Sequence, residues 1–297
     1  MIGRYNATLA FGWRDTLGNE TLNRGPLEGH SLGLLGAGNM AEALARGILA
    51  SAALPAGRIL VSDVSDERRA LFQDRLGIQA TADNLKVVGA SDLLVLCVKP
   101  HQVDAVLQQI AGAVQPERHV LASICAGVTT ARLEQPLPQG ARVVRVMPNT
   151  PMLVRLGASC LCGGRNARPS DLEAIEALFA CASLTLRVEE RMMDAVTGLS
   201  GSGPAYLFYL VEAMVAAGVA EGFSREQATA LATRTVLGAA QMLEQTGSPP
   251  EELRRRVTSP NGTTQAAIER LDADQVKAKI SAAIRRAAER SRELGRS

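Results

Sequence analysis

The sequence has few aromatic residues, few histidines and almost no net charge, and each shortage excludes something. Phe, Trp and Tyr make up 3% of the 297 residues, so the core must consist of aliphatic side chains and alanine. The formal net charge of +2 gives no support to a nucleic-acid partner. The three histidines, His30, His101 and His119, show no metal-ligand spacing, so we expect no metal site.

Disulfide and membrane signals are also missing. The five cysteines form no C-x-x-C pair and are odd in number, so we expect buried, reduced thiols in a cytoplasmic protein. No run of apolar residues approaches the roughly 20 needed to cross a membrane, so no membrane association is expected. Residues 1–30 lack the apolar stretch of a signal peptide. They are a poorly ordered extension, an artefact of start-site choice or a small docking arm.

From residue 31 onward, short apolar runs alternate with helical patterns. The runs predicted to be strands are 32–35, 58–62, 92–98, 119–124, 141–147, 158–162 and 184–188. This alternation is typical of right-handed βαβ units and a parallel sheet. Because the strands are apolar throughout, the sheet should be covered on both faces. We predict an α/β fold with a parallel-sheet domain over residues 31–190.

Beyond residue 190 the strand signals stop. Helical patterns cover 205–220, 225–245 and 273–294, and the first of these is apolar on every face. About 100 residues of helix enclose little interior, so such a helix needs a partner surface. We therefore predict that residues 191–297 form an all-helical C-terminal domain that dimerises.

The hexapeptide at 36–41, GAGNMA, matches G-x-G-x-x-A and lies between a predicted strand and a predicted helix. Gly36 allows a tight turn, Gly38 lets the backbone approach a pyrophosphate, and Ala41 lets the helix pack close to the strand. The phosphates then meet free N–H groups at the positive end of the helix. In this context the motif indicates a Rossmann-type dinucleotide site rather than only a tight connection.

Asp63 follows the second predicted strand. An acidic residue at this distance from the glycines usually binds the ribose 2′-OH and disfavours a 2′-phosphate, which favours NADH. Arg68 and Arg69 lie just beyond and can meet such a phosphate, so NADPH stays open. The alternative is structural, with Asp63, Ser65 or Asp66 capping the next helix.

Loops at the carboxyl ends of later strands are further candidates, because ligands bind at that edge of a parallel sheet. Lys99 either touches nucleotide or substrate or belongs to an ordinary loop. Ala126-Gly127 is placed beside the nicotinamide. The loop 147–151, MPNTP, walls a substrate pocket or is only a turn.

Two segments in the helical half differ from ordinary connections. Three glycines in the segment 198–204, GLSGSGP, exceed what helix capping needs, so close backbone approach is expected there. Ser202 suits a helix cap and Pro204 a first helical turn. In the segment 258–264, TSPNGTT, consecutive N–H groups from Gly262 to Thr264 can form a nest for a carboxylate.

Together these motifs resemble those of pyrroline-5-carboxylate reductases. The matching segments are GAGNMA at 36–41, Asn84, VKP at 98–100, AGVT at 126–129, VMPNTP at 146–151, TGLSGSGPAY at 197–206 and TSPNGTT at 258–264. The resemblance implies NADH- or NADPH-dependent reduction of Δ1-pyrroline-5-carboxylate to L-proline, the last step of proline biosynthesis. It also implies an N-terminal Rossmann domain, a C-terminal helical domain that interlocks into a homodimer, and dimers that often assemble into decamers.

The resemblance also implies site residues. Cofactor contacts fall on Leu35, Gly36, Ala37, Gly38, Asn39, Met40, Asp63, Asn84, Cys97, Val98, Lys99, Pro100, Ile124, Cys125 and Ala126. Substrate contacts fall on Ser259, Asn261, Gly262, Thr263 and Thr264, where backbone N–H groups hold the single carboxylate of the small-molecule substrate. Thr264 is the catalytic candidate and reaches the ring nitrogen. A threonine hydroxyl is a poor acid, so we assign it orientation.

This chain departs from the family pattern twice and has two rivals. Asn261 replaces a glycine, but asparagine tolerates positive φ, so the loop should keep its shape. His101 replaces a glutamine and is left out of the catalytic set. A β-hydroxyacid dehydrogenase would need a junction lysine, which residues 190–206 lack. A non-catalytic dinucleotide sensor would need the glycine turn but not the 262–264 loop.

Overall fold

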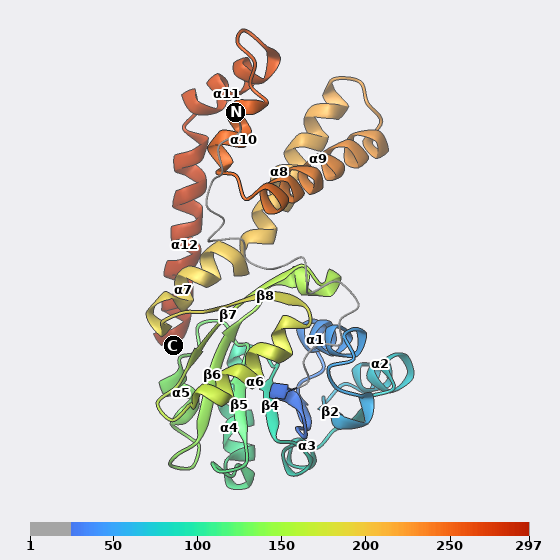
Figure 1. Cartoon of the computed structure of the whole chain (residues 1–297), viewed down its shortest axis with the longest axis vertical. Helices are drawn as coiled ribbons and strands as arrows, with labels where there is room; N and C mark the ends of the chain where they lie inside the picture. The colour runs from blue at the N-terminus through green and yellow to red at the C-terminus, as the bar shows by residue number, and fades with distance from the viewer. Residues whose placement is uncertain (1–24, 297) are drawn as a thin grey trace, which may run out of the picture. The chain divides into compact units, whose positions relative to one another are not determined.

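The computed structural model describes residues 25–296, which divide into two compact units (Figure 1). One unit holds residues 25–204 and 284–296, and the other is Ala205–Ala283. The chain passes between the units inside two helices, α8 (Gly203–Ala220) and α12 (Val276–Arg296). The domain boundary at residue 190 stays a prediction.

The first unit is built on an eight-stranded sheet with the order β3-β2-β1-β4-β5-β6-β7-β8. Its strands are β1 Leu32–Leu35, β2 Ile59–Ser62, β3 Gln79–Thr81, β4 Leu93–Leu96, β5 Val120–Ser123, β6 Arg142–Met147, β7 Gly157–Gly163 and β8 Ser183–Arg187. All seven predicted strands are present, each within two residues of its predicted bounds. The order reverses between β1 and β4, and ligands of open α/β sheets bind at the carboxyl edge beside such a switch point.

Helices cover both faces of the sheet (Figure 1). They are α1 Asn39–Ala50, α2 Asp66–Leu76, α3 Asn84–Ala90, α4 Val103–Ile110, α5 Thr130–Glu134, α6 Pro169–Ala180 and α7 Met193–Val196. Side chains of α1, α2 and α6 share one apolar cluster, and those of α3, α4 and α5 share the other. The strands β1, β4 and β5 are buried along their whole length, as the continuous apolar runs predict.

The sheet differs from the predicted one in two ways. The strand β7 runs antiparallel to β6, so the sheet is only mostly parallel. Nine residues join these strands, whereas a parallel return needs a crossover of roughly a dozen or more. The sequence analysis also missed β3, a three-residue edge strand that is ordered by its pairing with β2 and carries no apolar pattern.

The last six residues of the predicted extension over residues 1–30 lie in the folded unit. Residues 25–30 belong to the fold, with the 3-10 turn η1 at Gly25–Leu27 and the Leu27 side chain 4% exposed in the core. The earlier part of the expected extension lies outside the described residues.

The second unit consists of helices. They are α8, α9 Arg225–Thr246, α10 Pro250–Arg256, α11 Thr263–Ala273 and the first part of α12. The pattern over 273–294 predicted one helix starting at residue 273. Instead α11 ends at Ala273, and Gln275 adopts a φ of +54° before α12 begins. A left-handed residue stops the helical hydrogen-bond ladder, so the helix is broken there.

The prediction that no segment is long and apolar enough to cross a membrane is wrong by length and composition. The helical stretch Glu190–Ala220 has a mean hydropathy of 1.4 in its most apolar window. This stretch is long because Thr197–Gly201 forms a π turn that joins α7 to α8. Length and composition alone are weak evidence for a membrane span, because the core helix of a soluble protein meets the same criteria.

Candidate functional site

The glycine turn between β1 and α1 has the geometry of an anion site. Gly36 has a φ of +102° and donates its N–H to the carbonyl of Ser62 over 2.8 Å. Gly38 is the N-cap residue of α1 and offers no side chain to cap it. The first helical hydrogen bond runs from the Glu42 N–H to the Gly38 carbonyl. The N–H groups of residues 39–41 therefore have no helical acceptor and face the open end of the helix.

The two glycines of this turn have different surroundings. A Cβ on Gly36 would lie 2.8 Å from the carbonyl oxygen of Cys97, so this glycine is required by packing as well as by its φ. A Cβ on Gly38 would find its nearest atom at 3.9 Å, and its φ of −69° suits any residue. Space is therefore left at Gly38 on the side where a pyrophosphate would approach.

Asp63 is bonded to the glycine turn and does not cap a helix. Its carboxylate accepts the N–H of Ala37 over 2.7 Å and that of Ser65 over 2.9 Å. The cap of α2 is Ser65, whose hydroxyl accepts the Arg68 N–H, so the alternative that Asp63 caps the helix is wrong. The carboxylate thus holds β2 to the turn and lies where a ribose hydroxyl would bind.

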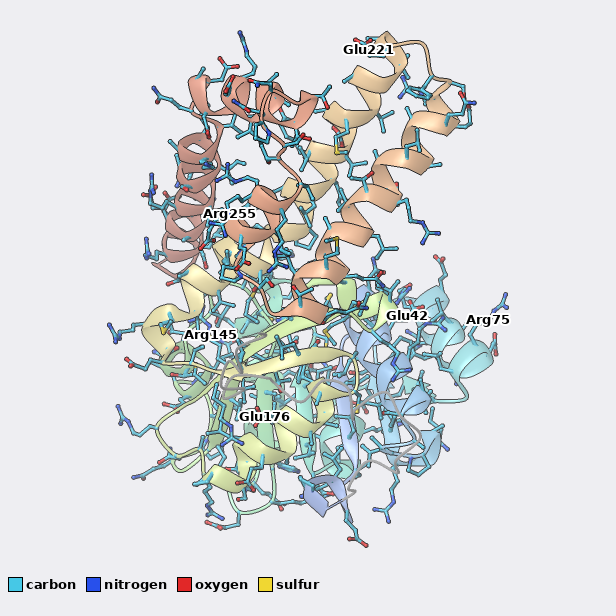
Figure 2. The ribbon with its side chains drawn as sticks, turned by 45° about the horizontal axis from the view of Figure 1, so that its top comes forward. Glu42, Arg75, Arg145, Glu176, Glu221 and Arg255 are labelled. Carbon is cyan, nitrogen blue, oxygen red and sulfur yellow. The ribbon has the colours of Figure 1, made fainter. Side chains whose placement is uncertain are left out.

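Two arginines lie beside the same turn. Arg68 donates from Nε to the carbonyl of Ala37 over 2.6 Å and pairs with Glu42, which is labelled in Figure 2. Burial raises the pKa of Glu42, but hydrogen bonds and charge from Arg46 and Arg68 outweigh burial and hold this pKa below its usual range. Arg69 donates to the Asp63 carbonyl over 2.6 Å. Both guanidinium groups therefore hydrogen-bond to backbone carbonyls of residues at this turn or just after β2.

The structure brings all the predicted cofactor residues to one edge of the sheet. Leu35 ends β1, residues 36–40 form the turn and the start of α1, Asp63 follows β2, and Asn84 begins α3. Residues 97–100 follow β4, and residues 124–126 follow β5. Asn84 accepts the Ser62 hydroxyl over 2.5 Å and donates to Gln109 over 2.8 Å, so its amide is fixed against β2. Binding by these residues stays a prediction.

Two thiols lie at this edge, those of Cys97 and Cys125. Burial raises the pKa of Cys97, and it raises that of Cys125 to about 11. The Cys125 thiol lies 3.2 Å from the carbonyl of Val98. Thiols with raised pKa values carry little thiolate at neutral pH. Among residues 25–296 no three side chains are grouped to hold a metal ion.

The loop after β6 is held in place by Asn149. Its amide donates to the carbonyl of Ser200 over 3.1 Å, and its side-chain oxygen accepts the N–H of Ala158 over 2.8 Å. A Cβ on Gly201 would lie 2.5 Å from the Met147 side chain, and one on Gly198 would lie 2.7 Å from the Ile284 carbonyl. The close backbone approach expected of this glycine-rich segment is confirmed at Gly198, whereas Gly201 meets a flexible side chain and Gly203 has no neighbour within 4 Å.

Sequence reasoning missed a buried polar network in this unit. Arg145 on β6, labelled in Figure 2, is 3% exposed and lies 3.5 Å from both Glu190 and Asp194. An arginine inside an otherwise apolar strand could have indicated this network, because a buried charge needs a partner of opposite charge. Its partners come from distant segments, so the sequence does not name them.

In the helical unit, the loop before α11 presents free N–H groups, one residue later than predicted. The Gly262 N–H donates to the Ser259 carbonyl over 3.1 Å, and Ala266 N–H makes the first helical bond to the Gly262 carbonyl. The unbonded donors are therefore the N–H groups of residues 263–265. Asn261 has a φ of +59°, so the tolerance of asparagine for positive φ is used at this position.

The mostly parallel strand order and the glycine turn define a Rossmann-type dinucleotide-binding protein. Comparison with known proteins narrows this class. Residues 190–294 match the family model for pyrroline-5-carboxylate reductase dimerisation, and residues 31–127 match that for coenzyme F420-dependent NADP oxidoreductases. The chain is 43% identical to the pyrroline-5-carboxylate reductase of Methanosarcina acetivorans over 91% of this chain and 100% of that protein. It is 44% identical to the Pseudomonas aeruginosa enzyme over 89% of this chain and 96% of that protein.

Solved structures agree. A pyrroline-5-carboxylate reductase from Coxiella burnetii superposes with a TM-score of 0.85 at 33% identity, covering 90% of this chain and 99% of that one. The Plasmodium falciparum pyrroline carboxylate reductase, solved with NADP bound, gives 0.81 at 29% identity with the same coverage. The chain belongs to the pyrroline-5-carboxylate reductase family.

Proposed function

We propose that this chain reduces Δ1-pyrroline-5-carboxylate to L-proline with NADH or NADPH, the last step of proline biosynthesis. The observation that carries the proposal is its 43% identity to a pyrroline-5-carboxylate reductase over that protein's entire length. The five free thiols within the described chain support a reducing compartment, and we infer that the enzyme works in the cytoplasm.

The edge around Gly36 fits a dinucleotide. Free N–H groups at residues 39–41, the open space at Gly38 and the Asp63 carboxylate match pyrophosphate and ribose in turn. When bound, the nicotinamide supplies the hydride. The chain's own residues fix its position, with residues 97–100 and 124–126 around the nicotinamide end. Asp63 favours NADH, whereas Arg68 and Arg69 leave room for NADPH.

The loop before α11 fits the substrate carboxylate. The N–H groups of Thr263, Thr264 and Gln265 point out of the first turn of an 11-residue helix, and their dipoles favour an anion there. We assign Ser259, Asn261 and Gly262 the shaping of this loop. We assign the Thr264 hydroxyl a hydrogen bond to the ring nitrogen, which orients the bound substrate.

We also propose that the helical unit forms a homodimer, and that dimers can assemble into a decamer. The family model that covers residues 190–294 is a dimerisation model. In one copy this unit has very few buried apolar side chains, and large ones stay open, including Phe208 at 65% and Leu231 at 54% exposed. An apolar surface of this kind is stable in water only when covered, and a second copy offers the matching surface.

A direct assay tests the proposed function. Purified protein should oxidise NADH or NADPH when Δ1-pyrroline-5-carboxylate is added, and the product should be L-proline. Parallel reactions in the reverse direction, with NAD or NADP and a series of 3-hydroxy acids, control for the rival dehydrogenase class. Oxidation of hydroxy acids without imine reduction would refute the proposal, and cofactor binding with neither activity would identify a sensor.

A further inference from the structure

The C-terminal helix returns to the nucleotide-binding unit. Residues 284–296 of α12 pack with residues 25–204, whereas the helix begins in the helical unit at Val276. Its last turns lie against the loop that follows β5, which is the loop assigned to the nicotinamide end of the cofactor. The contact rests on two glycines and on a polar network.

The glycines, Gly127 and Gly295, bring two backbones together. Gly127, in the loop after β5, has a φ of +77°, and a Cβ placed on it would lie 3.1 Å from the Ser291 carbonyl. A Cβ placed on Gly295 would lie 2.5 Å from the Gly127 carbonyl oxygen. No side chain separates the helix from the loop at this point, so a movement of one backbone displaces the other.

The polar network fixes the same two segments through buried Arg145. On the helix side, the Ser291 hydroxyl, 2% exposed, donates to Asp194 over 2.7 Å. On the loop side, Glu190 accepts both the N–H and the hydroxyl of Thr130, over 2.7 and 2.5 Å. Arg145 lies 3.5 Å from each carboxylate. Thr130 is the first residue of α5, so Glu190 holds the far end of the loop.

We propose that Ser291 and Gly295 are positioning residues for hydride transfer, because they hold the 124–129 loop at the nicotinamide end of the site. The start of this loop is fixed by β5, its middle by Gly295, and its end by Thr130 and Glu190. Neither positioning residue is among the predicted cofactor or substrate contacts. The proposal rests on the proposed function for its kinetic effect, but its structural effect is independent of activity.

Gly295→Ala tests the contact between helix and loop. The added methyl needs roughly 1 Å more room, and a misplacement of that size can lower turnover by about ten- to a hundredfold. The primary isotope effect with 4,4-dideuterated cofactor should rise, because hydride transfer becomes slower than release. The cofactor dissociation constant should change far less, since the pyrophosphate binds at the separate Gly36 turn. The matched control is Gly112→Ala, where a Cβ meets nothing within 4 Å.

Ser291→Ala tests the network, and Ser291→Thr, which keeps the hydroxyl, should restore most of the turnover. Hydrogen–deuterium exchange gives the readout that needs no activity. Both Gly295→Ala and Ser291→Ala should speed exchange in residues 124–134 and leave residues 36–48 unchanged.

Unchanged exchange at 124–134 in both variants would overturn the proposal, whether or not the protein reduces the imine. A loss of thermal stability with an unchanged isotope effect would also overturn it. An inactive wild-type protein whose variants still loosen 124–134 would refute only the proposed function.

Discussion

The paired substitutions Gly36→Ala and Gly38→Ala separate the two tasks of the glycine turn. At Gly36 a methyl group would lie 2.8 Å from the Cys97 carbonyl oxygen and would force alanine to a φ of +102°. Backbone strain of this kind costs about 1–3 kcal/mol and overpacking a further 1–3 kcal/mol, so the free energy of unfolding should fall by about 2–6 kcal/mol. That is a large part of the 5–15 kcal/mol typical of a folded domain.

At Gly38 the same methyl group meets nothing nearer than 3.9 Å, and the φ of −69° is ordinary. The cofactor-free protein should keep its stability or gain up to about 1 kcal/mol, because alanine loses less backbone entropy on folding. The methyl group does, however, fill the space that a pyrophosphate needs. Affinity for NADH and NADPH should fall at least about tenfold, equivalent to about 1.4 kcal/mol.

The assay compares thermal unfolding of the cofactor-free proteins with cofactor binding by fluorescence titration. Gly36→Ala should lower the melting temperature, and Gly38→Ala should lower affinity alone. The reasoning is refuted if Gly36→Ala has the same melting temperature as the wild type, or if Gly38→Ala binds both cofactors as tightly as the wild type.

Three further outcomes are expected. Thr264→Ala should lower turnover severalfold and change cofactor affinity little, and unchanged steady-state kinetics would remove this hydroxyl from the mechanism. Asp63→Ser should shift the ratio of NADPH to NADH efficiency toward NADPH, and a constant ratio would make the carboxylate purely structural. Burial and the charge of Arg118 hold the pKa of His119 below its usual value, and its Nδ1 accepts the Gln115 N–H. Below about pH 6.5, His119 therefore binds a proton in the unfolded chain but stays neutral in the folded chain. The free energy of unfolding therefore falls as the pH falls. Urea unfolding at pH 7.5 and 5.5 should show a smaller loss for His119→Asn than for the wild type.

Local pattern was enough for the central sheet and the glycine turn. Continuous apolar runs identified the buried parallel strands β1, β4 and β5 at the centre of the sheet, and the 36–41 motif specifies its own backbone shape. Asn261 is a similar case, because its tolerance of positive φ is a property of the residue itself. The resemblance then supplied the reaction class, which no spacing in the chain provides.

Other features depended on contacts between distant segments. The short strand β3 has no apolar pattern and exists through its pairing with β2. The nine-residue connection between β6 and β7 is too short for a parallel crossover and so indicates an antiparallel β7. The alternation of strands and helices favoured a parallel strand instead. The free N–H groups at the start of α11 begin at Thr263, because the Gly262 N–H already donates to the Ser259 carbonyl.

The sequence by itself determined the buried central strands β1, β4 and β5, the position of the glycine turn at 36–41, and the family that the motifs resemble, because each of these is encoded by residues that are neighbours in the chain. Only the tertiary structure decided that Asp63 bonds to Ala37 and that α12 returns to the loop after β5. It alone joined Ser291 to the Arg145 network, across almost a hundred residues of chain. Burial of a charge demands a partner, but packing selects which partner it finds.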